Sequence, residues 1–494
     1  MGTSTGRGHE HSHSQNRFAV PPTPLRLGVD SERTGRGVTI AFLDSGFYPH
    51  PDLTQPINRI VAYEDITSTG ASLQSNRTPD DSDWHGTMTS VAGAGNGRLS
   101  DGVYRGLASE ARLVLVKVSD RGKITEPNIE RGLRWVIANK DRYNIRVISI
   151  SLGGDDDVSY QQNAVDQAAE DAVRAGMVVV VAAGNSGCTE RHKTVPPANA
   201  PSVITVGGYD DNNKPGSEPA LYCSSFGVTA DGIVKPEVIA PAMWVAAPIL
   251  PGTDAYRRAE AVSIIASSPD YMIREIARAA SGGNENGLWK RADLPDWLRV
   301  AAVDAIRAEL SRLLEEGKII AAHYQHVDGT SFAAPVIASL VALMIEANPL
   351  ITPAAVKHIL ISTANRIGSA PAIRQGYGVV DATRALEEAE RESHFAEELF
   401  DCPPRVVDRR LEFTHHNDSA SSVSLAGDFN NWDHTRVPLA RTERGNWRAE
   451  IDAPLPGVYR YKLVIDGRRW IEDPANLIKE PDGYGGFNSV LQIS

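Results

Sequence analysis

The sequence is poor in cysteine, with only Cys188, Cys223 and Cys402 among 494 residues. An odd number leaves at least one thiol unpaired, and the spacing matches no pattern of metal ligands. We therefore expect free thiols in a reducing compartment. A disulfide between Cys188 and Cys223 is the alternative that the sequence leaves open.

Long apolar runs and a secretion signal are also missing. No stretch of about eighteen or more apolar residues occurs, so we expect no segment that spans a membrane. Residues 1–24 are polar and lack the apolar segment of a signal peptide. We expect a flexible tail there, in preference to a divalent-metal site built from His9, His11 and His13. The expected location is cytoplasmic.

Positive charge is in deficit, because 62 Asp and Glu residues outnumber 50 Lys and Arg residues and give a net charge of −12. Nucleic-acid phosphates would be repelled, so nucleic acid is not an expected partner. Hydrophobic content of 41% and charged content of 23% are ordinary for a soluble globular protein. The length exceeds one ordinary domain, and two units are expected.

Three short segments carry the residues of a nucleophilic site. Asp44 ends the apolar run Val38–Leu43, His85 precedes Gly86-Thr87, and Ser331 lies in Gly329-Thr330-Ser331. A serine hydroxyl is a weak nucleophile unless an imidazole accepts its proton and a carboxylate orients that imidazole. The residue types therefore indicate a serine hydrolase with Asp44, His85 and Ser331 as acid, base and nucleophile.

The local patterns suit these roles. The run before Asp44 predicts a buried strand that delivers a carboxylate to its tip. The segment Phe332–Ala347 is apolar almost throughout and predicts a helix, in which Pro335 is tolerable in the first turn. Such a helix would place backbone N–H groups beside Ser331, where negative charge develops during acyl transfer.

The remaining pattern predicts an α/β fold with a parallel sheet, because apolar strands alternate with helices. The predicted strands are 112–118, 146–152, 177–183 and 203–206, and the predicted helices are 126–140 and 160–175.

The order of the three motifs and their flanking residues resembles the subtilisin-like serine proteases over about residues 25–390. This resemblance implies a serine endopeptidase with a parallel sheet and helices on both faces. Asn185 in Gly184-Asn185-Ser186-Gly187 would be the oxyanion donor. The walls of the substrate pocket would be Ser151, Leu152, Gly153 and Gly154 on one side and Ala182, Ala183 and Gly184 on the other. Only about 37 residues precede Val38, which leaves no room for the folded pro-domain of secreted members.

Three further positions are interpreted through the same resemblance. The run Asp155-Asp156-Asp157 is either a solvated loop or an acidic rim that favours Arg or Lys before the cut. Asp52 matches a carboxylate that binds structural calcium in the family, so calcium is a possible cofactor. Met88 departs from the family, which commonly has a second histidine there.

Residues 244–325 form an insertion that ordinary family members largely lack. Its pattern is helical, with a start at Ser268-Pro269-Asp270. The apolar faces predicted for its two helices comprise Met272, Ile273, Ile276 and Ala280, then Leu298, Ala302, Ile306, Leu310 and Leu313. We expect these stripes to pack within their own domain, while a lid or exosite over the cleft is the alternative.

A segment rich in Glu, Arg and Pro at residues 391–410 predicts a linker to a β-sandwich at 411–494. The sandwich sequence resembles the early-set glycogen-binding module of the AMP-activated protein kinase β-subunit. That resemblance implies that Trp432 and Trp470 stack on glucose rings and that Lys462 and Asn488 bind hydroxyls. The expected partners are peptide substrates and an α-glucan such as glycogen. The alternatives are a protein-interaction sandwich on an active protease and a glycogen-bound scaffold with a dead protease fold.

Overall fold

The computed structural model describes residues 19–29, 32–68, 73, 79–155, 158–280, 287–392, 403–407, 409–442 and 445–493. The predictions that concern the histidine-rich tail, Asp156, Asp157 and Cys402 lie outside these residues.

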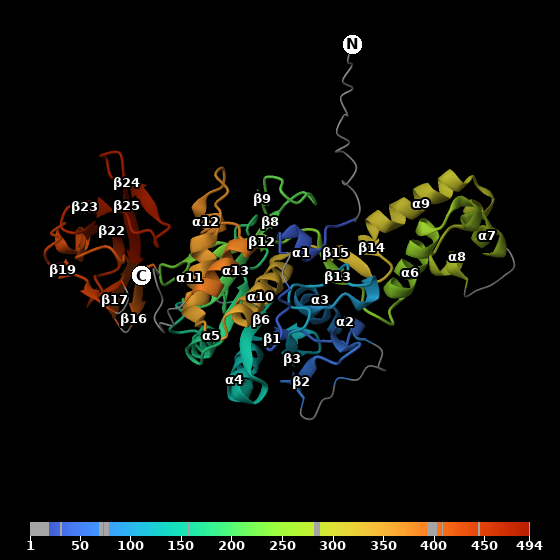
Figure 1. The fold of residues 1–494 in the computed structure, drawn as a ribbon, viewed down its shortest axis with the longest axis horizontal. Helices are drawn as coiled ribbons and strands as arrows, with labels where there is room; N and C mark the ends of the chain where they lie inside the picture. The colour runs from blue at the N-terminus through green and yellow to red at the C-terminus, as the bar shows by residue number, and fades with distance from the viewer. Residues whose placement is uncertain are drawn as a thin grey trace, which may run out of the picture.

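A parallel sheet forms the centre of the larger unit (Figure 1). Its strand order is β12-β8-β7-β6-β1-β3-β2, and β9 (Ala220–Leu221) pairs antiparallel with β8. The parallel strands are β1 (Thr39–Asp44), β2 (Ile60–Asp65), β3 (Arg112–Lys117), β6 (Ile145–Ile150), β7 (Val178–Ala182), β8 (Ile204–Asp210) and β12 (Val238–Pro241). Every residue of β1 is buried, as expected for an inner strand of a sheet covered on both faces.

Helices cover both faces of this sheet, as the sequence predicted. On one face lie α3 (Asp83–Ala94), α10 (Thr330–Ala347), α11 (Pro353–Thr363) and α13 (Ala382–Arg391). On the other lie α4 (Glu126–Tyr143) and α5 (Ala164–Arg174). Shorter elements are α1 (Thr23–Arg26), α2 (Pro51–Thr54), η1 (Arg98–Ser100), α12 (Ala372–Gln375) and the hairpins β4 (Ser119–Asp120)–β5 (Lys123–Ile124) and β10 (Gly227–Val228)–β11 (Val234–Lys235).

Two of these helices differ in detail from the sequence analysis. α5 begins later than the predicted residue 160, because the Asn163 side chain caps it by accepting from the N–H groups of Val165 and Asp166. α10 spans 18 residues and is long and apolar enough to cross a membrane, which the search for apolar runs did not indicate. Of this helix 83% is buried inside the protein, so it is the core helix of the large unit.

The insertion builds a small antiparallel sheet and a helical lobe. The sheet has the order β13 (Val245–Pro248)-β15 (Tyr324–Val327)-β14 (Ile319–Ala321). The lobe contains α6 (Asp254–Ser267), α7 (Asp270–Ala280), α8 (Leu288–Arg291), η2 (Asp296–Val300) and α9 (Val303–Glu316). It has its own core, which includes Ile265, Ile273, Trp289 and Leu310. The lobe extends from one end of the molecule, in agreement with the expectation that its apolar stripes pack internally (Figure 1).

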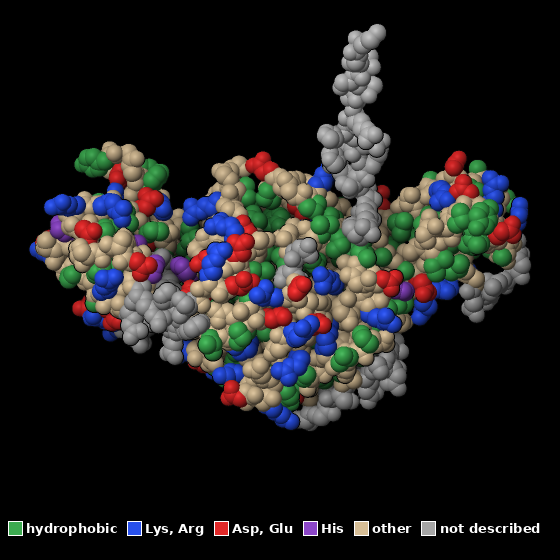
Figure 2. Space-filling model, in the orientation of Figure 1, with side chains coloured by type: hydrophobic (Ala, Val, Ile, Leu, Met, Phe, Trp, Pro, Cys, Tyr) green, Lys and Arg blue, Asp and Glu red, His purple; other side chains and the backbone are tan. Residues whose placement is uncertain are grey.

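The predicted stripes are wrong at three positions. Met272 is exposed, together with Tyr271, Trp297 and Val300 on α7 and η2, and Figure 2 shows apolar side chains gathered over this end of the lobe. Leu298 is buried but lies in the separate 3₁₀ turn η2, because Pro295 immediately precedes that turn. Ala302 is the exposed residue before α9 and not part of its apolar face.

The insertion sheet explains the departure at Met88. Val245 and Ala247 of β13 pack with Met88, Ala92 and Phe332 in one apolar cluster. A methionine there is covered by the insertion, whereas a histidine would lose water contacts on burial.

The C-terminal unit consists of two antiparallel sheets with the orders β16-β17-β21-β20 and β19-β18-β22-β25-β24, and β23 pairs with β22. The strands are β16 (Arg405–Val407), β17 (Arg410–His416), β18 (Val423–Gly427), β19 (Val437–Pro438), β20 (Ala440–Arg441), β21 (Asn446–Asp452), β22 (Gly457–Ile465), β23 (Arg469–Ile471), β24 (Lys479–Pro481) and β25 (Phe487–Ile493). Phe413, Leu425 and Tyr461 belong to its core. The predicted linker is too long at its end, because β16 already lies within residues 391–410.

Candidate active site

Asp44 and His85 meet where β1 ends and α3 begins. The carboxylate Oδ1 of Asp44 lies 2.7 Å from Nδ1 of His85. Thr89 Oγ1 donates to the other carboxylate oxygen at 3.0 Å, which fixes the plane of the acid. A side chain at Gly86 would overlap the carbonyl oxygen of Gly46, so glycine permits this close approach of α3 to β1. With Nδ1 committed to Asp44, Nε2 of His85 is the nitrogen available as base.

Electrostatics favour a basic imidazole at this position. Burial lowers the pKa of His85, but the charge of Asp44 and its hydrogen bond outweigh burial and bring the pKa above its ordinary value. The histidine is therefore a stronger proton acceptor than a free imidazole.

Ser331 lies in the first turn of α10 and contacts the segment after β6. Its hydroxyl donates to the carbonyl oxygen of Ser151 at 3.4 Å, and the Ser151 hydroxyl donates to the Ser331 carbonyl oxygen at 2.7 Å. In this conformation of the described residues the Ser331 hydroxyl bonds to Ser151 instead of His85. A hydrogen bond from Ser331 Oγ to His85 Nε2, which the expected roles need, would replace the bond to Ser151.

Asn185 is held against the start of the same helix. Its Oδ1 accepts from Thr330 N at 2.9 Å and from Thr330 Oγ1 at 3.1 Å. Because the oxygen is engaged, the Nδ2 group is the part of the amide left to donate. Thr330, which the sequence analysis did not select, is thus the residue that orients the predicted oxyanion donor.

The predicted walls follow two neighbouring parallel strands. Ser151, Leu152, Gly153 and Gly154 follow β6, while Ala182, Ala183 and Gly184 come at the end of β7 and directly after it. Ligands bind at the carboxyl ends of such strands. Asp155 is exposed at the end of the first wall, as the solvated-loop interpretation and the acidic-rim interpretation both require.

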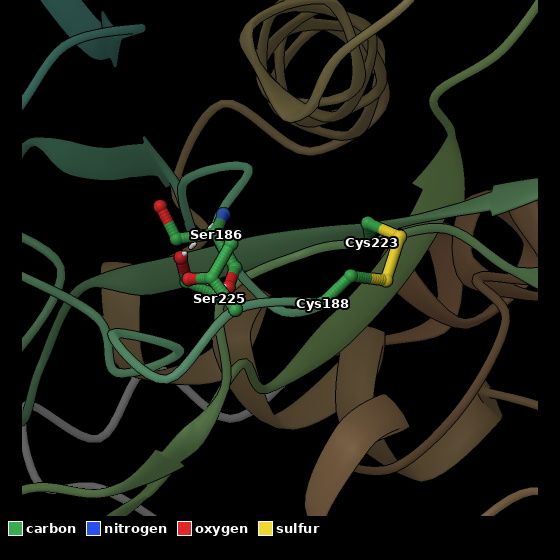
Figure 3. The surroundings of a disulfide bond; sticks show 5 residues. Ser186, Cys188, Cys223 and Ser225 are labelled. Atoms are coloured by element: carbon green, nitrogen blue, oxygen red, sulfur yellow. Dashed lines mark hydrogen bonds between the residues drawn. A yellow bond between two sulfur atoms is a disulfide. The ribbon is translucent and has the colours of Figure 1, made fainter.

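The Asn185 loop is joined to the segment before β10 by a disulfide between Cys188 and Cys223 (Figure 3). The expectation of free thiols is therefore wrong for this pair, and the alternative is correct. Hydrogen bonds run alongside the disulfide, from Ser186 N to Ser225 Oγ at 3.2 Å and from Ser225 N to Gly184 O at 2.8 Å. The motif analysis could not find the pairing, because 35 residues separate the cysteines and only the fold brings them together.

The surroundings of Asp52 do not fit calcium. Asp52 is buried, and its carboxylate accepts from Tyr324 Oη at 2.6 Å and from Leu99 N at 3.2 Å. Arg59 donates to the carbonyl oxygens of Asp52, Ala94 and Ala111 at 2.7, 2.6 and 2.9 Å.

Calcium needs about six to eight free oxygen ligands, whereas these oxygens are already satisfied. Among the described residues no group of three or more His, Cys, Asp or Glu side chains could hold a metal ion. Burial lowers the pKa of Arg59 to about 10, so the guanidinium keeps its positive charge at neutral pH. The Arg59 guanidinium thus lies against the backbone of Asp52, the residue that the resemblance connected with calcium.

The four predicted glucan residues gather on the sandwich. The rings of Trp432 and Trp470 are 6.5 Å apart and nearly parallel, at 22°. Trp470 is paired with Val464 of β22, whose side chain is on the same face as that of Lys462, two residues away. The β22–β25 register brings Asn488 opposite Lys462. Lys462 Nζ donates to Asp482 at 2.6 Å, and this bond, together with those from the N–H groups of Tyr484 and Gly486, lowers the pKa of Asp482 to about 2.

An oriented imidazole, a serine at a helix start and an amide donor beside it define a serine hydrolase built on a parallel α/β sheet. A family model described as "Subtilase family" matches residues 35–378, and one described as "Carbohydrate-binding module 48 (Isoamylase N-terminal domain)" matches residues 402–481. The protein therefore belongs to the subtilase family of serine proteases and carries a C-terminal module of the second type.

Two curated relatives agree with this assignment. The chain is 31% identical to serine protease AprX of Bacillus subtilis (strain 168) over 363 residues, which cover 72% of this chain and 67% of AprX. It is 34% identical to subtilisin NAT of Bacillus subtilis subsp. natto over 203 residues, 40% of this chain and 48% of that protein. A cold adapted subtilisin-like serine proteinase of known crystal structure is 21% identical with a TM-score of 0.43, covering 71% of this chain and 89% of that one.

The raised pKa of His85 predicts the pH profile. The imidazole must be neutral to accept a proton, so kcat/KM should rise with pH through a pKa above the ordinary value of 6.5. Asp44→Asn should move this limb to lower pH, because the attraction that raises the pKa is lost, and should reduce kcat by roughly 10⁴. Hydrolysis rates of a peptide measured from about pH 5 to about pH 9 report both effects. An unchanged limb in the variant would contradict the role of Asp44.

Removal of the disulfide should destabilise the protein. Closing a loop of 35 residues contributes about 3 to 4 kcal/mol by constraining the unfolded chain. The double variant Cys188→Ser, Cys223→Ser should therefore inactivate faster on heating, as should the wild type after reduction with dithiothreitol. Cys402→Ser is the matched control and should keep the wild-type rate. Equal rates in all forms would show that the bond is not formed in solution.

The hydrogen bonds of Arg59 predict that the thermal stability of the protein does not depend on calcium. Chelation with EDTA should leave the thermal midpoint unchanged, because Arg59 already satisfies the carbonyl oxygens. Arg59→Met should lower the midpoint by several degrees, since three buried acceptors lose their donors at about 1 to 3 kcal/mol each. Arg98→Met, at an exposed arginine of η1, is the control. A large shift on chelation of the wild type would refute this account of the site.

Proposed function

We propose that the protein is a serine endopeptidase that acts through an acyl-enzyme on Ser331 and is concentrated on its substrates by a sandwich that binds an α-glucan such as glycogen. Ser331 Oγ attacks the peptide carbonyl while Nε2 of His85 accepts the proton. Asn185 Nδ2 and the Ser331 N–H stabilise the oxyanion, and His85 then returns the proton to the leaving amine. A water molecule then attacks the acyl-enzyme, and His85 again accepts and returns the proton as the second product is released. No metal or organic cofactor enters any step of this proposal.

The observation that carries the glucan proposal is the shared face of Trp432, Trp470, Lys462 and Asn488. Two nearly parallel aromatic rings suit the apolar C–H faces of successive sugars, and amide and ammonium groups beside them suit the hydroxyls. The indole N–H of Trp432 donates to Asp428 Oδ1 at 3.0 Å, which fixes that ring before any ligand binds. Tyr484, which the sequence analysis passed over, is 97% exposed, and its N–H donates to Asp482, the partner of Lys462.

The disulfide bears on the cellular location of the protein. The cytoplasmic expectation stays a prediction, and the Cys188–Cys223 disulfide weighs against it, because such bonds persist mainly in oxidising compartments.

The protease activity is tested with the whole chain and Ser331→Ala. The wild type should cleave an unstructured protein and react with a fluorophosphonate probe, and the variant should do neither. If the wild type neither cleaved nor reacted, the inactive scaffold would replace this proposal.

Glucan binding is tested by sedimentation of the full chain with glycogen. Trp432→Ala and Trp470→Ala should each weaken binding by about ten-fold or more, since each removes one stacking surface. Trp297→Ala removes an exposed tryptophan of the insertion and serves as the matched control. If neither sandwich variant changed the bound fraction, the sandwich would be assigned to protein interaction.

A further inference from the structure

The imidazole of His85 is contacted by two aromatic side chains from different elements. The ring of Trp84, in the first turn of α3, lies perpendicular to it, with the ring centroids 5.2 Å apart. The ring of Phe332, in the first turn of α10, is tilted by 48° at a centroid distance of 6.0 Å. Both distances fall in the range at which aromatic rings attract one another. His85 is therefore held by its ring as well as by its hydrogen bond to Asp44.

Phe332 connects the base to the nucleophile and to the insertion. It directly follows Ser331 on α10, so its contact with His85 joins the two helix starts that carry the reacting side chains. Phe332 is only 4% exposed and packs with Val245 and Ala247 of β13. A ring enclosed in this way has little freedom to move when a peptide binds. The insertion sheet thus supports one of the two ring contacts on the imidazole.

The same contacts limit the access of water to the imidazole. Only 20% of the His85 side chain is exposed. Trp84 is 47% exposed, so part of its indole is open to solvent while the ring lies against His85. Burial disfavours the charged form of the imidazole, and Asp44 is the charged group whose effect opposes burial. Removal of the indole would admit water and relieve part of the effect of burial.

We propose that Trp84 and Phe332 are positioning residues for the peptidase reaction, which keep the imidazole of His85 in the orientation for proton transfer and restrict water around it. The proposal rests on the peptidase activity above. Neither aromatic side chain transfers a proton in this role, so both act through His85. An imidazole held by its ring needs no reorientation when the Ser331 hydroxyl leaves Ser151 and bonds to it.

The first test compares Trp84→Ala and Trp84→Phe with the wild type in the hydrolysis of a peptide. In Trp84→Ala, kcat should fall by about ten-fold with KM almost unchanged, because a loosened base slows proton transfer without weakening substrate binding. Trp84→Phe keeps a ring at this position and should restore most of kcat. Trp297→Ala, at an exposed tryptophan of the insertion, is the matched control and should keep the wild-type values of both constants.

A second measurement follows the protonation of His85. With the indole removed, water can reach the charged imidazole, so the pKa of His85 should rise above that of the wild type. This shift is opposite to the one expected for Asp44→Asn, and it therefore separates the loss of Trp84 from a loss of the contact with Asp44. The pH dependence of kcat/KM reports the shift, and NMR titration of the imidazole in the Ser331→Ala background reports it without turnover.

Phe332→Leu tests the other ring, since leucine keeps an apolar side chain in the cluster with β13 but removes the aromatic contact. Its kcat should also fall, with KM almost unchanged. Unchanged kcat and an unchanged pKa of His85 in Trp84→Ala would overturn the proposal. A rise in KM at constant kcat would also overturn it, because Trp84 would then bind the substrate instead. Failure of the peptidase assignment would be distinct, because the wild type would hydrolyse no peptide while the NMR titration of His85 could still be measured.

Discussion

The close contact between α3 and the end of β1 is the constraint on which the site depends. Gly86 allows the helix to approach Gly46, and this approach brings the His85 ring within 2.7 Å of Asp44. The far end of α3 is fixed against α10 in the same way. The hydroxyl of Ser339 donates to the carbonyl oxygen of Gly93 at 2.7 Å, and a side chain at Gly93 would press on Pro335. Small residues thus align two helices whose first turns carry His85 and Ser331.

The sheet of the insertion packs against α3, whereas the helical lobe of the insertion does not take part in that packing. The sheet packs on Met88 of α3, and Tyr324 donates to Asp52 of α2. Arg59 supplies the positive charge of that region from within the chain. Beyond the sheet, the helical lobe keeps its own core around Trp289. The packing around α3, which carries His85, therefore depends on side chains of the insertion, while the lobe is held together by its own core.

Much of the fold and the site could be predicted because their signals are local. The apolar runs predicted the central strands to within a few residues, and the flanks of Asp44, His85 and Ser331 identified the family. The failures share a physical cause, since each depends on partners distant in sequence. The disulfide and the hydrogen bonds of Arg59 to three carbonyl oxygens are visible only once the chain has folded.

The sandwich is docked onto the protease unit and not merely tethered to it. Gln161 Nε2 donates to Val406 O at 2.9 Å, and the Tyr377 hydroxyl donates to Ala475 O. A tethered module explores a volume set by its linker, whereas a docked one gives the two sites a fixed separation and orientation. If the sandwich bound a polymer, the effective concentration of the protease would be high only for certain protein substrates. These substrates would lie at one distance and angle from the bound sandwich. Proteins buried within the polymer or far from its surface would not be cleaved. The contact between the two units would therefore limit which substrates the protease can reach.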